Sequence, residues 1–214
     1  MPKPPHYQGA EVRTIFGLDL GKVHDFTALS CVDRFRWSMP TTADTFADYV
    51  WYGCRAIKQY DIKTDYPVIV DNVKEIVARP EFVDPVIVVD ATGVGVPVVD
   101  WMRRARMRAR IIPVTICGGA SQRWEPETGS WWVAKQILIS NIQLLLQVER
   151  FKIAAEAENR ETAMQELRTY QCKLSKAGNE IYNAREGEHD DIVLSLAVAC
   201  WYGERAQRKI AIRV

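Results

Sequence analysis

Hydrophobic residues are spaced in two ways along the chain, and the change near residue 85 separates a strand-rich first part from a second part of alternating strands and helices. In the first part, short apolar segments lie close together, which is typical of an antiparallel meander. Strands are predicted there for residues 11–20, 26–33 and 35–39. A helix is predicted for residues 42–60, because apolar residues recur at helical spacing after Thr42, a suitable N-cap. These apolar residues are Phe46, Val50, Cys54 and Ile57.

The second part opens with residues 85–90 (PVIVVD), a β-branched run without alternation, which is the pattern of a strand buried on both faces. Another buried strand is predicted for residues 111–116, and a β-hairpin for residues 170–175 and 180–184. Helices are predicted for residues 69–78, 96–107, 131–148, 154–169 and 192–202, and a loop for 118–129. Strands first, followed by alternating strands and helices, indicate an α/β fold with a mixed sheet.

The chain of 214 residues is long enough for one domain with a substantial core. We expect a flexible proline-rich arm over residues 1–10, a single domain over residues 11–207 and a basic tail over residues 208–214. No apolar run is long enough to span a membrane, so no membrane partner is expected. The five cysteines lie far apart, which argues against disulfides or a structural zinc site and favours a reducing cytoplasm. The formal net charge is only +1, so affinity for a polyanion has to come from local patches.

Acidic residues stand at the edges of the most strongly patterned elements. Asp19 lies at the end of the first predicted strand, and Asp90 closes the PVIVVD strand. Asp190 and Asp191 open the last predicted helix. Functional groups of α/β sheets collect at strand ends and at the helix starts that face them. Asp19 is flanked by two leucines; if these face one packed layer, Asp19 faces the other side of the sheet.

Converging carboxylates repel one another and are costly to bury unless hard cations such as Mg²⁺ or Mn²⁺ compensate their charge. Two such ions about 3.5–4 Å apart can clamp a scissile phosphate, activate a water and stabilise the leaving oxygen. Each aspartate also has a simpler explanation. Asp19 and Asp90 precede glycine-containing turns, and the adjacent pair at the helix start suits the positive end of the helix dipole. The joint pattern favours a two-metal site.

At these acidic residues the sequence resembles the nuclease domains of terminase large subunits from tailed bacteriophages. The resemblance is carried, in order, by IFGLDLGKVHDFTAL, PVIVVDATGVGVPVVDWM and EGEHDDIVLSLAVACWY, and runs from about Val12 to Tyr202. It implies a ribonuclease H-like fold, with a mixed β-sheet flanked by helices on both faces. It also implies a two-metal endonuclease that cuts packaged double-stranded DNA with little sequence preference.

The resemblance implies roles for single residues. Asp19, Asp90 and Asp190 would form the metal-binding triad, and Asp191 would be a fourth carboxylate. Which of the two adjacent aspartates is the principal ligand stays open, because a helix start could offer either. His189 would position DNA or a water, unless it is simply a helix-start histidine.

Several basic residues are candidates for DNA contact. The candidates are Lys22 and His24 beside Asp19, and Arg123, Lys135, Lys173 and Lys176. Five further arginines fall within residues 101–110. They are either phosphate contacts or the solvated end of a helix, where cations are favoured.

The chain departs from full terminase large subunits in one respect. It contains no G-x-x-x-x-G-K-[ST] phosphate loop, so it is not expected to hydrolyse ATP by itself. It is then either an excised domain or a nuclease encoded apart from its motor. The ATPase motor domain, the portal and the small terminase subunit are partners implied by the resemblance, in the cytoplasm of an infected bacterial cell.

Three alternatives compete with this interpretation. A Holliday-junction resolvase or another ribonuclease H-like nuclease would share the acidic residues but prefer branched DNA or RNA hybrids. A non-catalytic DNA-packaging module would carry the carboxylates as relics. The GLDLGK motif also resembles the first phosphate loop of sugar kinases and actin-like ATPases, but those proteins need a second domain for which the chain has no room.

Overall fold

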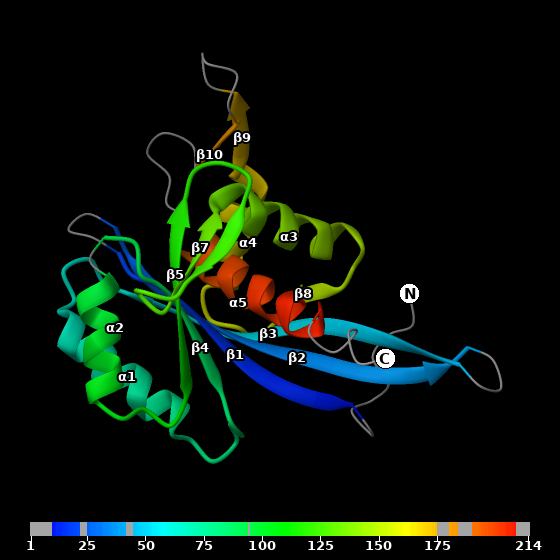
Figure 1. The fold of residues 1–214 in the computed structure, drawn as a ribbon, viewed down its shortest axis with the longest axis horizontal. Helices are drawn as coiled ribbons and strands as arrows, with labels where there is room; N and C mark the ends of the chain where they lie inside the picture. The colour runs from blue at the N-terminus through cyan, green and yellow to red at the C-terminus, as the bar shows by residue number, and fades with distance from the viewer. Residues whose placement is uncertain are drawn as a thin grey trace.

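The structure, a computed structural model, describes residues 10–21, 25–41, 45–93, 95–174, 180–183 and 190–208. An eight-stranded mixed sheet in the order β6-β7-β5-β4-β1-β2-β3-β8 forms its centre (Figure 1). The strands are β1 (Glu11–Asp19), β2 (Thr27–Pro40), β3 (Phe46–Tyr60), β4 (Val86–Asp90), β5 (Arg110–Cys117), β6 (Gln122–Glu125), β7 (Ser130–Ala134) and β8 (Phe151–Ile153). The helices are α1 (Tyr66–Val77), α2 (Gly95–Arg104), α3 (Lys135–Gln147), α4 (Arg160–Thr169) and α5 (Asp191–Arg208).

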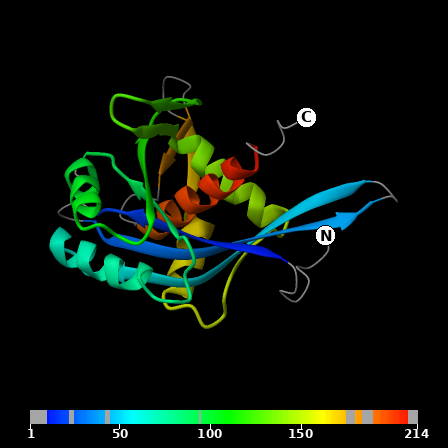
Figure 2. The ribbon, with the colours of Figure 1, turned by 60° about the horizontal axis from the view of Figure 1, so that its bottom comes forward.

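Helices cover both faces of the sheet (Figure 2). Helices α1 and α2 pack on one face, where they share a core with Phe16, Ile87 and Val89. Helix α5, with α3 and α4, packs on the other face, whose core includes Ile15 and Val88. The α/β class and the helices on both faces are thus as predicted. In the described ranges, no helix combines the length and apolar character needed to cross a bilayer.

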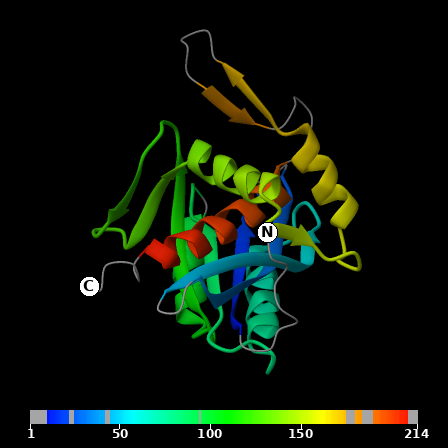
Figure 3. The same cartoon turned by 90° about the vertical axis from the view of Figure 1, so that its right-hand side faces the viewer.

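The predicted hairpin also forms, as β9 (Gln171–Leu174) and β10 (Glu180–Asn183). It is a separate two-stranded sheet that projects from the α4 end of the molecule (Figure 3). The expected arm (residues 1–10) and basic tail (residues 208–214) fall almost wholly outside the described residues.

The helix predicted for residues 42–60 is wrong, because Phe46–Tyr60 is the long strand β3. Val50, Tyr52 and Cys54 alternate into the α5-side core, as expected of a strand. A β-bulge then shifts the register, since Cys54 pairs with Val32 but Ala56 pairs with Cys31, which skips Arg55. The extra residue moves Ile57 to the same face as Cys54. A strand with one bulge thereby imitates the three-residue spacing of a helix.

Other boundaries differ in smaller ways. Residues 26–33 and 35–39 form one strand, β2, and the loop predicted for 118–129 contains β6. The helix predicted for residues 131–148 begins only at Lys135, because its first residues pair with β5 as the aromatic strand β7. The helix predicted for 154–169 starts only at Arg160, after Asn159 in a left-handed conformation. Strand β8 was not predicted.

Candidate active site

The register of the parallel strands β1 and β4 brings two carboxylates together. Leu18 pairs with Val89, so the next pair in the same register is Asp19 and Asp90. Leu18 and its neighbour Leu20 lie in the α1/α2-side core, which turns Asp19 to the α5 side, as predicted. Asp90 follows Val88 by two residues and therefore faces the same side.

Helix α5 adds the other two aspartates. Asp191 is its first residue, and Asp190 precedes it. The helix lies close to β1 because Gly17 has no side chain: a Cβ there would lie 1.8 Å from the Ser195 carbonyl oxygen. This contact is two residues from Asp19 on the same face of β1, so it sets how the start of α5 approaches the strand ends.

Asp19 is buried, with 6% of its surface exposed. Burial, followed by repulsion from Asp90, Asp191 and Asp190, raises the pKa of its carboxyl well above the usual value. Asp19 also shares a side-chain hydrogen bond with Asp90. The four predicted aspartates are therefore close enough to act on one another electrostatically, although they come from three separate segments of the chain.

Asp90 is oriented by the turn that follows it. Its Oδ1 accepts hydrogen bonds from the Thr92 backbone N–H at 2.8 Å and from the Thr92 hydroxyl at 2.5 Å. The Thr92 hydroxyl oxygen accepts a hydrogen bond from the Ile116 N–H on β5 at 2.8 Å, which ties the turn to the sheet. Burial raises the pKa of Asp90, while the bonds from Thr92 oppose the rise.

Lys135, a predicted DNA contact, lies among the carboxylates at the start of α3. Its Nζ is 2.8 Å from Oδ2 of Asp190. Its positive charge also lowers the pKa of Asp90, against the larger effect of burial. The lysine therefore compensates part of the negative charge at the strand ends.

A fifth carboxylate, Glu166 on α4, was missed by the sequence analysis. Its Oε2 accepts a hydrogen bond from the Val193 N–H at 3.1 Å, in the first turn of α5. Burial, chiefly, raises the pKa of Glu166 to about 8, with repulsion from Asp191 and Asp190 adding to the rise. In the sequence it lies in a charged segment that reads as an ordinary solvated helix, so no pattern marked it.

Among the other predicted DNA contacts, the structure describes only the side chain of Arg123, which lies away from the carboxylates. Arg123 on β6 lies with its guanidinium carbon 4.8 Å from the centre of the Trp132 ring and pairs with Glu125 at 3.8 Å. Trp132 lines a pocket with Ala91 and Thr115, which places this pair on the α2 side of the sheet. For Lys173 only the backbone position on β9 is described. The remaining candidates lie outside the described residues: Lys22, His24, Lys176 and His189.

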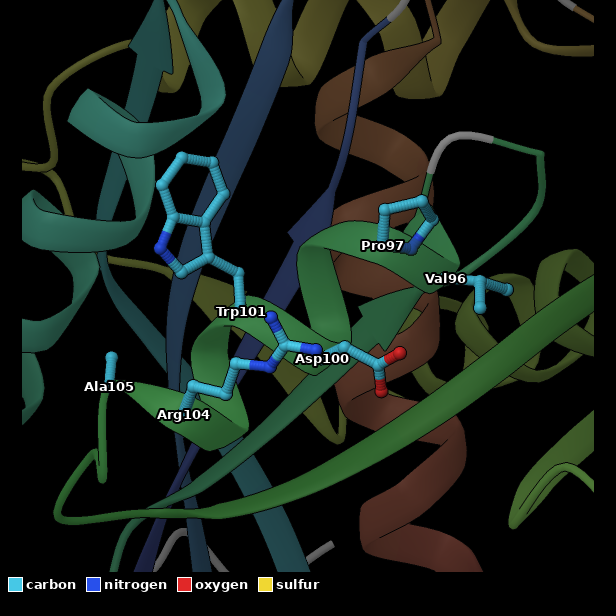
Figure 4. A pocket seen from close by; sticks show the side chains of 6 residues that line it. All are labelled: Val96, Pro97, Asp100, Trp101, Arg104 and Ala105. Atoms are coloured by element: carbon cyan, nitrogen blue, oxygen red, sulfur yellow. The ribbon is translucent and has the colours of Figure 1, made fainter.

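The arginine-rich segment after Asp90 belongs partly to α2. A pocket of about 580 Å³ opens on the outer face of this helix, and Figure 4 shows Trp101, Arg104 and Asp100 among its lining residues. Arg103 pairs with Asp100 at 3.3 Å on the same helix. Of these arginines, Arg104 lines this surface pocket on α2, on the face of the sheet opposite α5.

Carboxylate oxygens are hard donors that suit Mg²⁺ or Mn²⁺. Among the described residues, no three Asp, Glu, His or Cys side chains already surround a common point at metal-binding distance. Asp19 and Asp90 share a hydrogen bond instead, and Asp190 binds Lys135. The donor set fits a divalent cation, because a cation would replace the shared proton and the lysine as the compensating charge.

The sheet order and the helices on both faces are those of a ribonuclease H-like fold. No family model and no curated protein sequence matches the chain. Several solved structures are similar to it. The large terminase nuclease of thermophilic phage G20c has a TM-score of 0.59 and 21% identity, over 88% of this chain and 81% of that one.

Two further structures agree with this similarity. The same G20c nuclease with bound magnesium has a TM-score of 0.59 and 22% identity, over 89% of this chain and 81% of that one. The large terminase nuclease domain of Thermus phage P74-26 has a TM-score of 0.56 and 19% identity, over 88% and 78%. The fold implied by the sequence resemblance is confirmed: this chain has the fold of these phage nucleases.

Proposed function

We propose that the chain is a metal-dependent endonuclease that cleaves double-stranded DNA, with little sequence preference, during viral genome packaging. The observation that carries the proposal is the pairing of Asp19 with Asp90 at adjacent strand ends, facing the two aspartates at the start of α5. The likeness to phage terminase nucleases, one of them with magnesium bound, supports it.

Asp19, Asp90, Asp190 and Asp191 would hold two Mg²⁺ or Mn²⁺ ions. When bound, the ions would supply water activation and charge neutralisation at the scissile phosphate, so no nucleophilic side chain is needed. The protein's own contribution is positioning. Thr92 fixes one oxygen of Asp90, and the rigid contact of α5 with β1 fixes the helix start.

Lys135 would have two roles in this reaction. It holds Asp190 in place before DNA binds, through the contact between its Nζ and Oδ2. A phosphodiester that approaches the carboxylates would meet the same ammonium group, which can then neutralise part of the phosphate charge. This keeps Lys135 as a proposed DNA contact.

The proposed partners and cellular location are taken from the similar phage nucleases. Their structures are of large terminase nucleases, so we propose that this chain acts with a terminase motor domain, a portal and a small terminase subunit. The reaction would take place in the cytoplasm of the infected bacterium.

Cleavage of supercoiled plasmid in Mn²⁺, Mg²⁺ or EDTA tests the proposal. The wild-type protein should nick and then linearise the plasmid in either metal but not in EDTA. Asp90→Asn should abolish cleavage, because it removes a metal-binding charge while keeping the shape. Asp100→Asn is the matched control: this exposed aspartate pairs with Arg103 on α2 and should cut like the wild type.

The same assay separates the alternatives. Four-way junctions and RNA–DNA hybrids are compared with linear duplex at equal concentration. Preferred cleavage of the junction would indicate a resolvase, and preferred cleavage of the hybrid another ribonuclease H-like nuclease. A folded wild-type protein that cuts none of these substrates in either metal would contradict the proposal and favour a non-catalytic packaging module.

A further inference from the structure

A pocket of about 580 Å³ lies on the α5 side of the sheet, and its lining includes Arg13 near the start of β1 and Tyr202 on the later turns of α5. Asp191 begins α5 and Tyr202 lies on its later turns, about 16 Å further along the helix axis. The pocket is therefore separate from the proposed catalytic site. We call it the basic-aromatic pocket. Its lining residues are Arg13, Arg110, Arg205, Trp124, Trp131 and Tyr202, together with Ile112.

Aromatic rings hold two of these arginines in place. The guanidinium carbon of Arg205 lies 3.5 Å from the centre of the Trp131 ring. Arg110 lies over the Tyr202 ring at 5.6 Å and donates a hydrogen bond to its hydroxyl. Stacking of this kind orients the planar guanidinium group before any ligand arrives. Trp124, another lining residue of the pocket, has 45% of its surface exposed.

Positive charge is concentrated here. Arg13 on β1 lies directly opposite Arg34 on β2. Like charges at directly opposite positions of a sheet repel each other. Arg34 is 4% exposed, and its Nε and Nη2 have no hydrogen-bond partner among the described residues. An anion in this region would relieve the repulsion.

Three acidic residues close in sequence to the described lining residues pair with arginines outside the pocket. Glu204 pairs with Arg150 at 2.6 Å, Glu11 with Arg36 at 3.8 Å, and Glu125 with Arg123 at 3.8 Å, each from nitrogen to oxygen.

We propose that the basic-aromatic pocket binds single-stranded DNA, with Arg13, Arg110 and Arg205 on a phosphodiester and a base stacked on Trp124. Three arginines suit the phosphate, and an exposed tryptophan face suits an unpaired base. In a duplex the base faces are covered by their neighbours, so the tryptophan would add nothing. An acidic peptide would satisfy the arginines but has no ring for Trp124. The inference rests on the proposed function only in that DNA is the substrate.

The test measures binding of a short fluorescein-labelled oligodeoxythymidine by fluorescence anisotropy, in EDTA, between about 50 and 200 mM salt. Working without metal separates this site from cleavage, because a protein that fails to cut can still bind here. Arg13→Gln with Arg110→Gln should weaken binding about tenfold and reduce the slope of log affinity against log salt by about 1.4, the value for two lost contacts to a single strand.

Trp124→Ala should weaken binding about tenfold without changing the salt slope, because it removes stacking and no charge. Trp101→Ala is its matched control, since Trp101 is also 45% exposed but lies on α2. Lys74→Gln with Arg79→Gln removes two exposed charges near the end of α1 and is the control for the arginine pair. Both controls should bind like the wild type.

A second measurement locates the contact. Photocrosslinking of a bromodeoxyuridine oligonucleotide, followed by mass spectrometry, should mark the peptide that contains Trp124. The proposal is overturned if the pocket variants bind like the wild type or if the controls lose as much affinity. It is also overturned if a matched duplex, or an oligoglutamate peptide of equal charge, binds more tightly than the oligonucleotide through the same residues.

Discussion

At the scale of single residues, Asp19 shows how repulsion between the carboxylates affects the stability of the folded protein. Burial and three neighbouring aspartates raise its pKa well above the usual value of 3.8. As the pH rises above that value, the unfolded chain loses its proton while the folded protein keeps it, so stability falls until the folded-state pKa is passed. Asp19→Asn should therefore raise the melting temperature of the metal-free protein at neutral pH, and the gain should vanish near pH 4.

Differential scanning calorimetry of the two proteins across this pH range measures the effect. Asp48→Asn is a contrasting control, because hydrogen bonds from Ser38 and Arg36 lower the pKa of Asp48. Its substitution should leave neutral-pH stability unchanged or slightly reduced, since the residue is near the surface. A melting temperature that drops at neutral pH in Asp19→Asn would contradict the assignment of Asp19 to a repulsive cluster.

Glu166 gives a second pH prediction with a higher window. Its pKa in the folded protein is about 8, against a usual value of 4.5. Stability should fall as the pH rises from about 4.5 to 8, because only the unfolded chain releases the proton in that range. Glu166→Gln should flatten this decline, as measured by urea unfolding at several pH values. Glu161→Gln, an exposed residue of the same helix, should leave the profile unchanged.

The site residues that could be predicted from the sequence are those that lie at the end of a strand or the start of a helix. Asp19 and Asp90 end strands, and Asp191 starts a helix, so rules for α/β sheets place them together. Glu166 and the contact between Lys135 and Asp190 depend on how α3 and α4 pack against α5. No local sequence pattern encodes that packing. Glu166 was therefore missed, and Lys135 was predicted only as a DNA contact.

At the scale of elements, the contact between α5 and β1 depends on Gly17. A methyl group there would meet the Ser195 carbonyl oxygen, a backbone atom that cannot rotate away. Gly17→Ala should therefore destabilise the protein by about 3 kcal/mol, the upper part of the range for overpacked cores. Gly118→Ala is the control, because a Cβ at Gly118 meets nothing within 4 Å. Equal unfolding free energies for both variants in chemical denaturation would show that α5 does not lie this close.

Elements were predictable where one physical signal dominated. Strand β4 and residues 192–201 of helix α5 are continuous, buried and mostly apolar segments, and both were located from that sequence pattern. Strand β3 was predicted as a helix because its bulge at Arg55 breaks the two-residue alternation. Strand β7 was predicted as part of a helix, because it continues into α3 without a turn between them. One apolar segment therefore contains both a strand and a helix.

At the scale of the whole molecule, α5 joins two regions of opposite charge. Its start carries the aspartates, and its later turns carry Tyr202 and Arg205 of the basic-aromatic pocket. The sheet separates these regions in the same way, since β1 has Arg13 near its start and Asp19 at its end. A net charge of +1 conceals this polarity. Asp191 and Tyr202 are about 16 Å apart along the axis of α5, which exceeds the screening length of about 8–10 Å, so a phosphate held near Tyr202 would meet little repulsion from the start of α5.

The polarity makes the acidic end the natural place for a cation, and cation binding is linked to folding. A ligand that binds only the folded protein stabilises it by about 2.7 kcal/mol at a hundred times its dissociation constant. Mg²⁺ or Mn²⁺ should therefore raise the melting temperature of the wild-type protein at neutral pH, because a bound cation reduces the repulsion between the carboxylates. The rise should be much smaller in Asp19→Asn and Asp90→Asn, which have less repulsion to relieve and fewer donors. Asp100→Asn should respond like the wild type. Equal metal-induced shifts in all four proteins, followed by scanning fluorimetry, would show that the ions bind elsewhere and that the carboxylates are not the metal site.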